Sequence, residues 1–139
     1  MRYVLTLPGF RGELEAERYA MATIESHGAT ISYEVHGSGP AIVFAHGAGG
    51  NTLSWWQQVP FFARNYRVVL FDHRGFGRLR CPSTLMPPRF FPADLTAILN
   101  AEGMTSAALV CQSMGGYTGL PFALAHPERV SALVLSSPL

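Results

Sequence analysis

The feature that most constrains the fold of this chain is a series of four short apolar runs, separated by longer segments with turn and helix signals. The runs are AIVFA (41–45), YRVVLF (66–71), SAALVC (106–111) and SALVLSS (131–137). A run that is apolar at nearly every position suits a strand buried on both faces, as in a parallel sheet. Strands that alternate with helices imply right-handed βαβ crossovers. The expected fold class is therefore α/β, with a mostly parallel sheet.

Two β-rich runs precede this series. MATIES (21–26) and TISYEV (30–35) are joined by His27-Gly28, which predicts an N-terminal β-hairpin. We expect His27 and His36 to be exposed residues of this hairpin region. Helices are predicted between the later runs, at LSWWQQVPFFARN (53–65), RFFPADLTAILNAEGM (89–104) and MGGYTGLPFALAHPERV (114–130).

Residues 1–20 do not share this pattern. The segment RGELEAERYA (11–20) lacks a sustained apolar face. We therefore expect residues 1–20 to be an N-terminal extension and residues 21–139 to form the domain. The 139 residues are 48% hydrophobic and 14% charged, which is typical of a globular chain with one core.

Charge and cysteine content argue against several classes of function. The net charge is +1 and no basic cluster is present, so neither a nucleic-acid partner nor an anionic membrane is expected. No apolar run approaches the ~20 residues of a membrane span, and the N-terminus does not have the pattern of a signal peptide. Cys81 and Cys111 are too few for a disulfide framework or a metal site. A reducing, cytoplasmic location without metal or cofactor is the expectation.

The strongest chemical signal is the stretch VCQSMGG (110–116), which places Ser113 between a buried strand and a helix. A serine at such a sharp turn projects its Oγ above the sheet, as in the nucleophile elbow G-x-S-x-G. Cys111 occupies the first glycine position and is small enough to be tolerated there, while Gly115 and Gly116 follow the serine. The next helix presents N–H groups and its positive dipole end to a developing oxyanion. A serine N-cap at an ordinary βα turn is the alternative.

A second Gly-rich turn, HGAGGN (46–51), follows the run AIVFA. Its glycines leave backbone N–H groups free to point into a site. We interpret His46 as a structural residue that braces the loop. The backbone N–H groups of Ala48 and Met114 are the expected donors of an oxyanion hole.

The motifs HGAGG, DHRGFGR (72–78) and QSMGG occur in this order, each after a buried strand, and together they resemble the α/β-hydrolase family. The resemblance runs from about Met21 to the end and is closest to small esterases, enol-lactonases and cofactor-free perhydrolase-like members. It implies a serine hydrolase that acts on a small ester, lactone or related acyl substrate. By position, Ser113 matches the nucleophile, and Ala48 and Met114 match the oxyanion-hole donors.

Asp72 and Arg74 match the D-x-R-G-x-G loop of that family, which is expected to hold the site rather than to react. Three features depart from the family pattern. Leu79 replaces the serine after this loop, Pro121 removes a backbone hydrogen bond inside the helix after the elbow, and the chain ends at Leu139. A serine nucleophile also argues against the branches that use aspartate, such as epoxide hydrolases and haloalkane dehalogenases.

The residues after Ser113 do not supply an acid and a base in the order expected for this fold, in which Asp or Glu and then His follow the serine. His126 and Glu128 are the only histidine and acid there, in reverse order and at the far end of the predicted helix. His73 is a less remote base, but no acid follows to orient it. We therefore expect a truncated α/β-hydrolase fold, the N-terminal half of the domain, without its later strands, lid, acid and histidine, and inactive by itself.

Several alternatives remain at this point. Trp55 and Trp56 could bind substrate or could pack the first helix. The chain could be a non-catalytic α/β module that binds a small ligand or a partner. A dinucleotide-binding βαβ unit is a further alternative, with Asp72 as the ribose-binding acid, although Thr52 occupies the third glycine position of G-x-G-x-x-G. The last strand would be an apolar edge, open to a complementing chain or to self-association.

Overall fold

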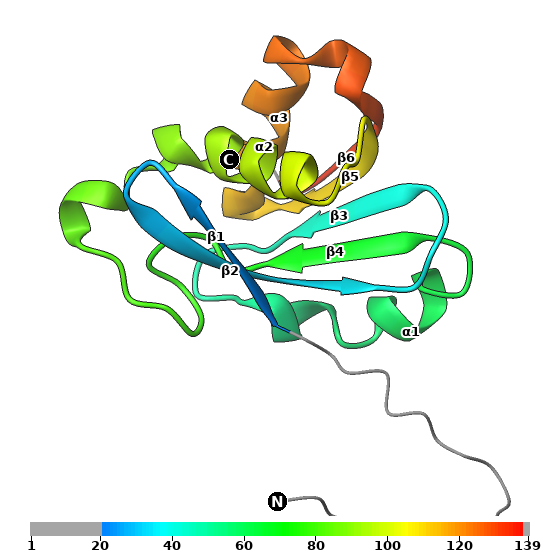
Figure 1. Cartoon of the computed structure of the whole chain (residues 1–139), viewed down its shortest axis with the longest axis horizontal. Coiled ribbons are helices and arrows are strands. Elements are labelled where there is room, and N and C mark those ends of the chain that lie inside the picture. The colour runs from blue at the N-terminus through cyan, green and yellow to red at the C-terminus, as the bar shows by residue number, and fades with distance from the viewer. Residues whose placement is uncertain (1–20, 138–139) are drawn as a thin grey trace, which may run out of the picture.

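The computed structural model describes residues 21–137 and places their strands in one sheet, in the spatial order β1-β2-β4-β3-β5-β6 (Figure 1). The β1–β2 and β2–β4 pairs are antiparallel, whereas the β3–β4, β3–β5 and β5–β6 pairs are parallel. The expected α/β class with a mostly parallel sheet is confirmed. The strands are β1 (Ala22–Ser26), β2 (Ala29–His36), β3 (Ala41–Ala45), β4 (Arg67–Phe71), β5 (Ala107–Gln112) and β6 (Val130–Ser136).

The predicted hairpin is formed by β1 and β2, which the pair Ser26 and Ala29 closes. His27 has φ 45° and Gly28 has φ 77°, so both turn residues are left-handed. A two-residue turn of this kind matches the right-handed twist of the flanking strands. His27 is exposed, as expected. The expectation for His36 was wrong, because it is the last residue of β2 and its side chain is only 8% exposed, with its Nε2 3.1 Å from the carboxylate of Glu34.

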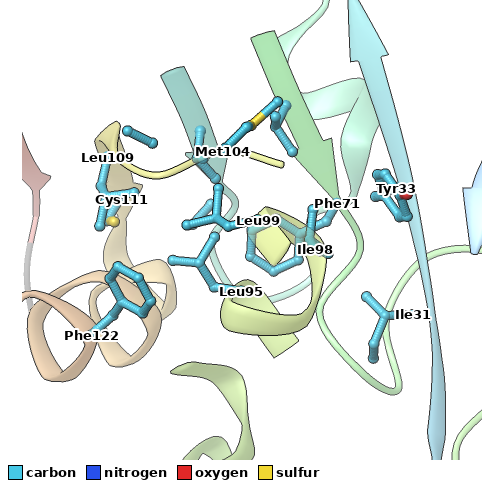
Figure 2. Packing of buried hydrophobic residues seen from close by; sticks show 14 of the residues in the cluster. Ile31, Tyr33, Phe71, Leu95, Ile98, Leu99, Met104, Leu109, Cys111 and Phe122 are labelled. Atoms are coloured by element: carbon cyan, nitrogen blue, oxygen red, sulfur yellow. The ribbon is translucent and has the colours of Figure 1, made fainter. Parts of the chain in front are cut away.

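Within residues 21–137, three α-helices cover the two faces of the sheet. Helices α2 (Phe91–Ala101) and α3 (Gly116–Ala125) lie together on one face, and the short α1 (Gln58–Phe62) lies on the other (Figure 1). The main core forms where α2 and α3 meet the sheet, and Leu95, Ile98 and Leu99 of α2 are each at most 1% exposed. Figure 2 shows these three side chains between Phe71 of β4 and Phe122 of α3. A smaller cluster under α1 is built on Phe44 and its neighbours in β3 and β4.

One predicted helix is not continuous. The segment 53–65 forms a four-residue 3₁₀ helix (Thr52–Trp55) and then the five-residue α1. Pro60 lies inside α1, and its missing N–H limits how far a regular helix can extend. The other two predicted helices are present but shorter. Helix α2 begins at Phe91 after a 3₁₀ turn, and α3 runs through Pro121 and ends at Ala125.

The order of the strands determines where a site can form. The chain passes from β3 to β4 on one side and returns to β5 on the other side of β3. Ligands of open α/β sheets bind at such a switch point, beyond the carboxyl ends of the strands. Residues 1–20, the expected extension, lie outside the described residues. Within residues 21–137, no helix is long and apolar enough to cross a membrane.

Candidate active site

Ser113 lies directly after β5, at the turn into the helix. Its φ of 47° is left-handed, a region in which a side chain other than Asn or Asp is uncommon. Backbone strain of this kind costs about 1–3 kcal/mol and persists where the surrounding structure enforces it. A 3₁₀ turn (Ser113–Gly115) follows and continues into α3 from Gly116. This is the strand–turn–helix geometry of a nucleophile elbow.

Two close backbone approaches enforce the turn. A Cβ at Gly115 would collide with the carbonyl oxygen of Ala45 in β3, so only glycine fits there. A Cβ at Gly119 would collide with the Sγ of Cys111, so the thiol occupies space that this glycine of α3 leaves free. Cys111 is 2% exposed, and burial raises the pKa of its thiol to about 11. The lack of a side chain at Gly119 therefore makes room for cysteine at the first position of the motif.

The loop after β3 lies beside the elbow. A Cβ at Gly47 would be 3.5 Å from the carbonyl oxygen of Gln112 and 3.5 Å from the Cβ of Ser113, so the two turns are in van der Waals range. Between the two turns lies a cavity of about 340 Å³ that is open to solvent. Its lining consists of the Gly-rich loop and the elbow: Gly47, Ala48, Gly49, Gly50, Ser54, Gln112 and Ser113. Ser113 and Ala48 are therefore brought together at one cavity, and Met114 follows Ser113 in the elbow.

Two members of this cavity were not anticipated from the sequence. Gln112 is exposed and directly precedes Ser113, a position that could have signalled a contact with substrate. Ser54 lines the opposite wall and hydrogen-bonds through its Oγ with the backbone N–H of Asn51 at 3.2 Å. The reciprocal bond runs from the Leu53 N–H to the side chain of Asn51, at 2.8 Å. These bonds fix the end of the Gly-rich loop.

His46 braces the loop from below. Its ring is fully buried, and its Nδ1–H donates to the carbonyl of Gly47 at 2.7 Å. Its Nε2 accepts the backbone N–H of His73 at 3.0 Å. Burial lowers the pKa of His46, and the nearby Asp72 offsets only part of this effect. The neutral ring is a structural support of the loop, as interpreted from the sequence.

Asp72 and Arg74 hold the neighbouring loop, as expected from the motif. The carboxylate of Asp72 is buried and accepts the backbone N–H groups of Thr52 at 2.8 Å and Arg78 at 3.2 Å. Both oxygens are engaged within the protein, which argues against a ribose-binding role. Arg74 is 2% exposed and forms a two-pronged ion pair with Asp94 of α2, with Nε to Oδ2 at 2.8 Å.

His73 is not positioned as a free base. It is 1% exposed, and its Nε2 lies 2.7 Å from the Oγ1 of Thr118 in α3. Burial, with a smaller effect from His46, holds the pKa of His73 well below its usual value. His126 lines a different cavity, between α2 and the hairpin, and its Nδ1 lies 3.8 Å from Glu128. Within residues 21–137, no imidazole lines the cavity at Ser113.

The two tryptophans lie outside the lining of this cavity. The ring of Trp55 packs on Phe44 with a centroid distance of 4.9 Å, as part of the smaller core cluster. Trp56 is 69% exposed. A substrate contact by either residue stays a prediction. Among the described residues, no group of three or more His, Cys, Asp or Glu side chains could hold a metal ion.

The comparisons with known proteins identify the family of the chain. The model of the alpha/beta hydrolase fold family matches residues 40–139. RutD of Azorhizobium caulinodans, a candidate carbamate hydrolase, is 34% identical over 112 residues, which cover 79% of this chain and 42% of that protein.

Two solved structures have a similar fold over most of this chain. An enzyme that degrades N-acyl homoserine lactones is 34% identical with a TM-score of 0.79, covering 84% of this chain and 45% of that one. An epoxide hydrolase from Vigna radiata is 28% identical with a TM-score of 0.78, covering 86% and 40%. The chain thus spans less than half the length of these relatives. The family match, the elbow and the strand order together show that the chain belongs to the α/β-hydrolase family.

Proposed function

We propose that the chain carries the nucleophile and the oxyanion hole of a serine hydrolase that acts on a small ester, lactone or related acyl substrate. The observation that carries this proposal is the left-handed Ser113, φ 47°, at the cavity that the Gly-rich loop lines. An N-capping serine at an ordinary turn needs no such strain, because its φ and ψ lie in the β region.

In the proposed reaction the Oγ of Ser113 attacks the acyl carbon and its proton passes to a histidine. The backbone N–H groups of Ala48 and Met114 receive the oxyanion of the tetrahedral intermediate. The leaving alcohol takes the proton from the histidine, and water then releases the acid from the acyl-enzyme by the same steps. Carbamates and lactones, which two of the relatives are named for, both present such an acyl carbon.

The histidine and its acid are proposed to come from a segment that follows β6, in a longer chain or in a complementing chain. In this fold the acid and the histidine follow the nucleophile along the sequence. The described part of β6 pairs only with β5, and Val134 is 52% exposed. An apolar edge of this kind is where a further parallel strand would pair. By itself, the chain of 139 residues is proposed to be inactive.

The first experiment extends the coding frame past Leu139 and expresses the longer protein. We expect an Asp or Glu and then a His in the added sequence, and hydrolysis of p-nitrophenyl acetate that Ser113→Ala lowers by about 10³-fold or more. Gly116→Ala is a matched control, because a Cβ there meets nothing within 4 Å. A frame that stops at Leu139, with no second chain that restores activity, would overturn the proposed enzyme.

A fluorophosphonate probe tests the nucleophile directly. We expect the extended or complemented protein to be labelled, and Ser113→Ala to abolish the label. Labelling that persists in the variant contradicts the assignment of Ser113. A second candidate function is a non-catalytic module that binds a small ligand at this open cavity, and binding of an ester without turnover would favour it. We also propose a cytoplasmic location, because Cys81 and Cys111 are both free thiols.

A further inference from the structure

A line of buried polar side chains connects helix α3 with the loop after β3. The Oγ1 of Thr118 lies 2.7 Å from the Nε2 of His73, and the Nδ1 of His73 lies 3.2 Å from the Nε2 of His46. The Nδ1 of His46 lies 2.7 Å from the carbonyl oxygen of Gly47. All three side chains are at most 1% exposed. The line therefore crosses the core, from the helix after the nucleophile to the loop beside it.

The hydrogen bonds of this line have one consistent direction. Gly47 offers only a carbonyl, so the Nδ1 of His46 carries the hydrogen and its Nε2 is an acceptor. The backbone N–H of His73 donates to that Nε2, which confirms that it carries no hydrogen. The Nδ1 of His73 faces the same lone pair and must donate to avoid repulsion. Its Nε2 is then the acceptor for the hydroxyl of Thr118.

The last acceptor belongs to the peptide unit that matters for the proposed chemistry. The carbonyl of Gly47 and the N–H of Ala48 are two ends of one resonant peptide bond. A hydrogen bond to the carbonyl shifts electron density away from the nitrogen, so its N–H becomes a stronger donor. Hydrogen bonds in series polarise one another, by roughly 10–30% per bond.

We propose that Thr118, His73 and His46 form a directed hydrogen-bond relay that polarises the Gly47–Ala48 peptide and strengthens the Ala48 N–H as an oxyanion donor. This inference rests on the proposed function. The three side chains are positioning residues, because they act through the peptide and do not touch the substrate. Thr118 belongs to α3, which directly continues the 3₁₀ turn that carries Met114, so the relay also ties the two oxyanion donors to each other.

The surroundings keep the relay neutral. Burial lowers the pKa of both histidines. Each ring also packs on aromatic rings, with centroid distances of 5.8 Å from His46 to Phe76, and of 4.7 and 4.5 Å from His73 to Phe71 and Phe91. A proton on either Nε2 would remove an acceptor and break the line. A neutral relay at neutral pH is what the direction of the bonds requires.

The first test uses nitrogen-15 NMR of the chain as it exists and does not depend on activity. We expect the imidazole shifts to show hydrogen on Nδ1 and none on Nε2 for both His46 and His73. Hydrogen on the Nε2 of His73 would reverse the bond to Thr118 and overturn the relay.

A pair of variants at Thr118 tests its effect on the peptide. Thr118→Val keeps the shape and removes the hydroxyl, whereas Thr118→Ser keeps the hydroxyl. We expect Val, and not Ser, to move the Ala48 amide proton upfield, with an unchanged fold by circular dichroism. Equal shifts in the two variants would indicate a merely structural threonine.

The functional readout is the rate at which a fluorophosphonate modifies Ser113 in the extended or complemented protein. Loss of a whole oxyanion donor lowers kcat by about 10²–10³-fold. Thr118→Val only weakens one donor, from the far end of the relay, so it should slow labelling by about 2–10-fold. Thr118→Ser should restore the rate. Absence of labelling in the unmodified protein would defeat the proposed function alone, because the NMR test still decides the relay.

Discussion

The two edges of the sheet differ in how they meet the solvent. On one side the hairpin strand β1 turns Thr23 and Glu25 outward, and helix α2 packs against it. On the other side β6 turns Val134 outward, 52% exposed, and Leu124 of the adjacent α3 is 77% exposed. An edge with polar side chains is protected against pairing with other chains, whereas an apolar edge is not. The hairpin edge therefore carries side chains that oppose further pairing, and the β6 edge is suited to receive another strand.

This difference follows from the order of the sequence. The hairpin edge is tied to later elements, because Nη2 of Arg74 donates to the carbonyl of Ser26 at 2.9 Å while the same guanidinium pairs with Asp94. Leu133 and Leu135 of β6 pack against the main core, whereas Ala132 and Val134 on the opposite face of the strand are exposed. The hairpin edge is therefore held by contacts with later elements, whereas the β6 edge presents exposed apolar side chains.

The largest change in unfolding free energy is expected from removing the Arg74–Asp94 ion pair, which holds the hairpin edge. Asp94→Ala leaves the buried guanidinium of Arg74 without its carboxylate, which should cost about 3–5 kcal/mol of unfolding free energy. The control is Glu102→Gln at the more exposed pair with Arg67, where the amide can still accept from the hydroxyl of Tyr33 and the cost should be at most about 1 kcal/mol. Urea denaturation followed by circular dichroism measures both. Equal losses in the two variants would show that the buried pair does not hold this edge.

A smaller effect is expected from adding charge to the open edge. Val134→Lys should weaken self-association of the chain by about tenfold, because edge lysines oppose strand pairing. Thr23→Lys, at the hairpin edge, should leave association unchanged, because that edge already carries exposed polar side chains. Sedimentation velocity over a range of concentrations compares the variants. If the two lysines act alike, the edges do not differ in the way described.

The smallest effect concerns the two thiols. Because burial raises the pKa of Cys111 to about 11, only about one molecule in a thousand carries its thiolate at pH 8. Cys81 is half-buried in a loop. Ellman's reagent should therefore modify Cys81 first and Cys111 only after β5 and α3 separate. Rapid reaction of both thiols in the folded chain would show that the open edge unfolds locally far more often than we expect.

Much of the fold could be predicted because its signals are local. The four apolar runs became β3 to β6, and His27-Gly28 predicted the hairpin through its turn chemistry. The helix over 53–65 was predicted too long, since Pro60 lacks the N–H that would continue a regular helix and only short turns form there. The position of β4 between β2 and β3 was not predicted, because no local pattern specifies strand order.

The candidate site also has a part that local sequence signals predict and a part that depends on tertiary contacts. Ser113 and the Gly-rich loop were found because strand, turn and glycine are adjacent in the sequence. The contact of His73 with Thr118 joins residues 45 positions apart and exists only because β4, β3 and β5 are neighbours. The partner of Arg74 likewise lies 20 residues away, on a different element. Such pairs depend on the tertiary arrangement, and a single sequence does not reveal them.

The contact of Cys111 with Gly119 has a consequence for how this elbow can change over time. While the thiol is present, any side chain at 119 collides with it, so Gly119→Ala is closed as a first step. Replacing Cys111 by glycine removes that collision, and an alanine at 119 then meets only the Cδ1 of Leu133, at 3.2 Å, which must shift slightly. The two substitutions are therefore accessible in one order only, with Cys111→Gly first. A search for G-x-S-x-G alone misses a chain such as this one, which has cysteine at 111 and the small residue at 119.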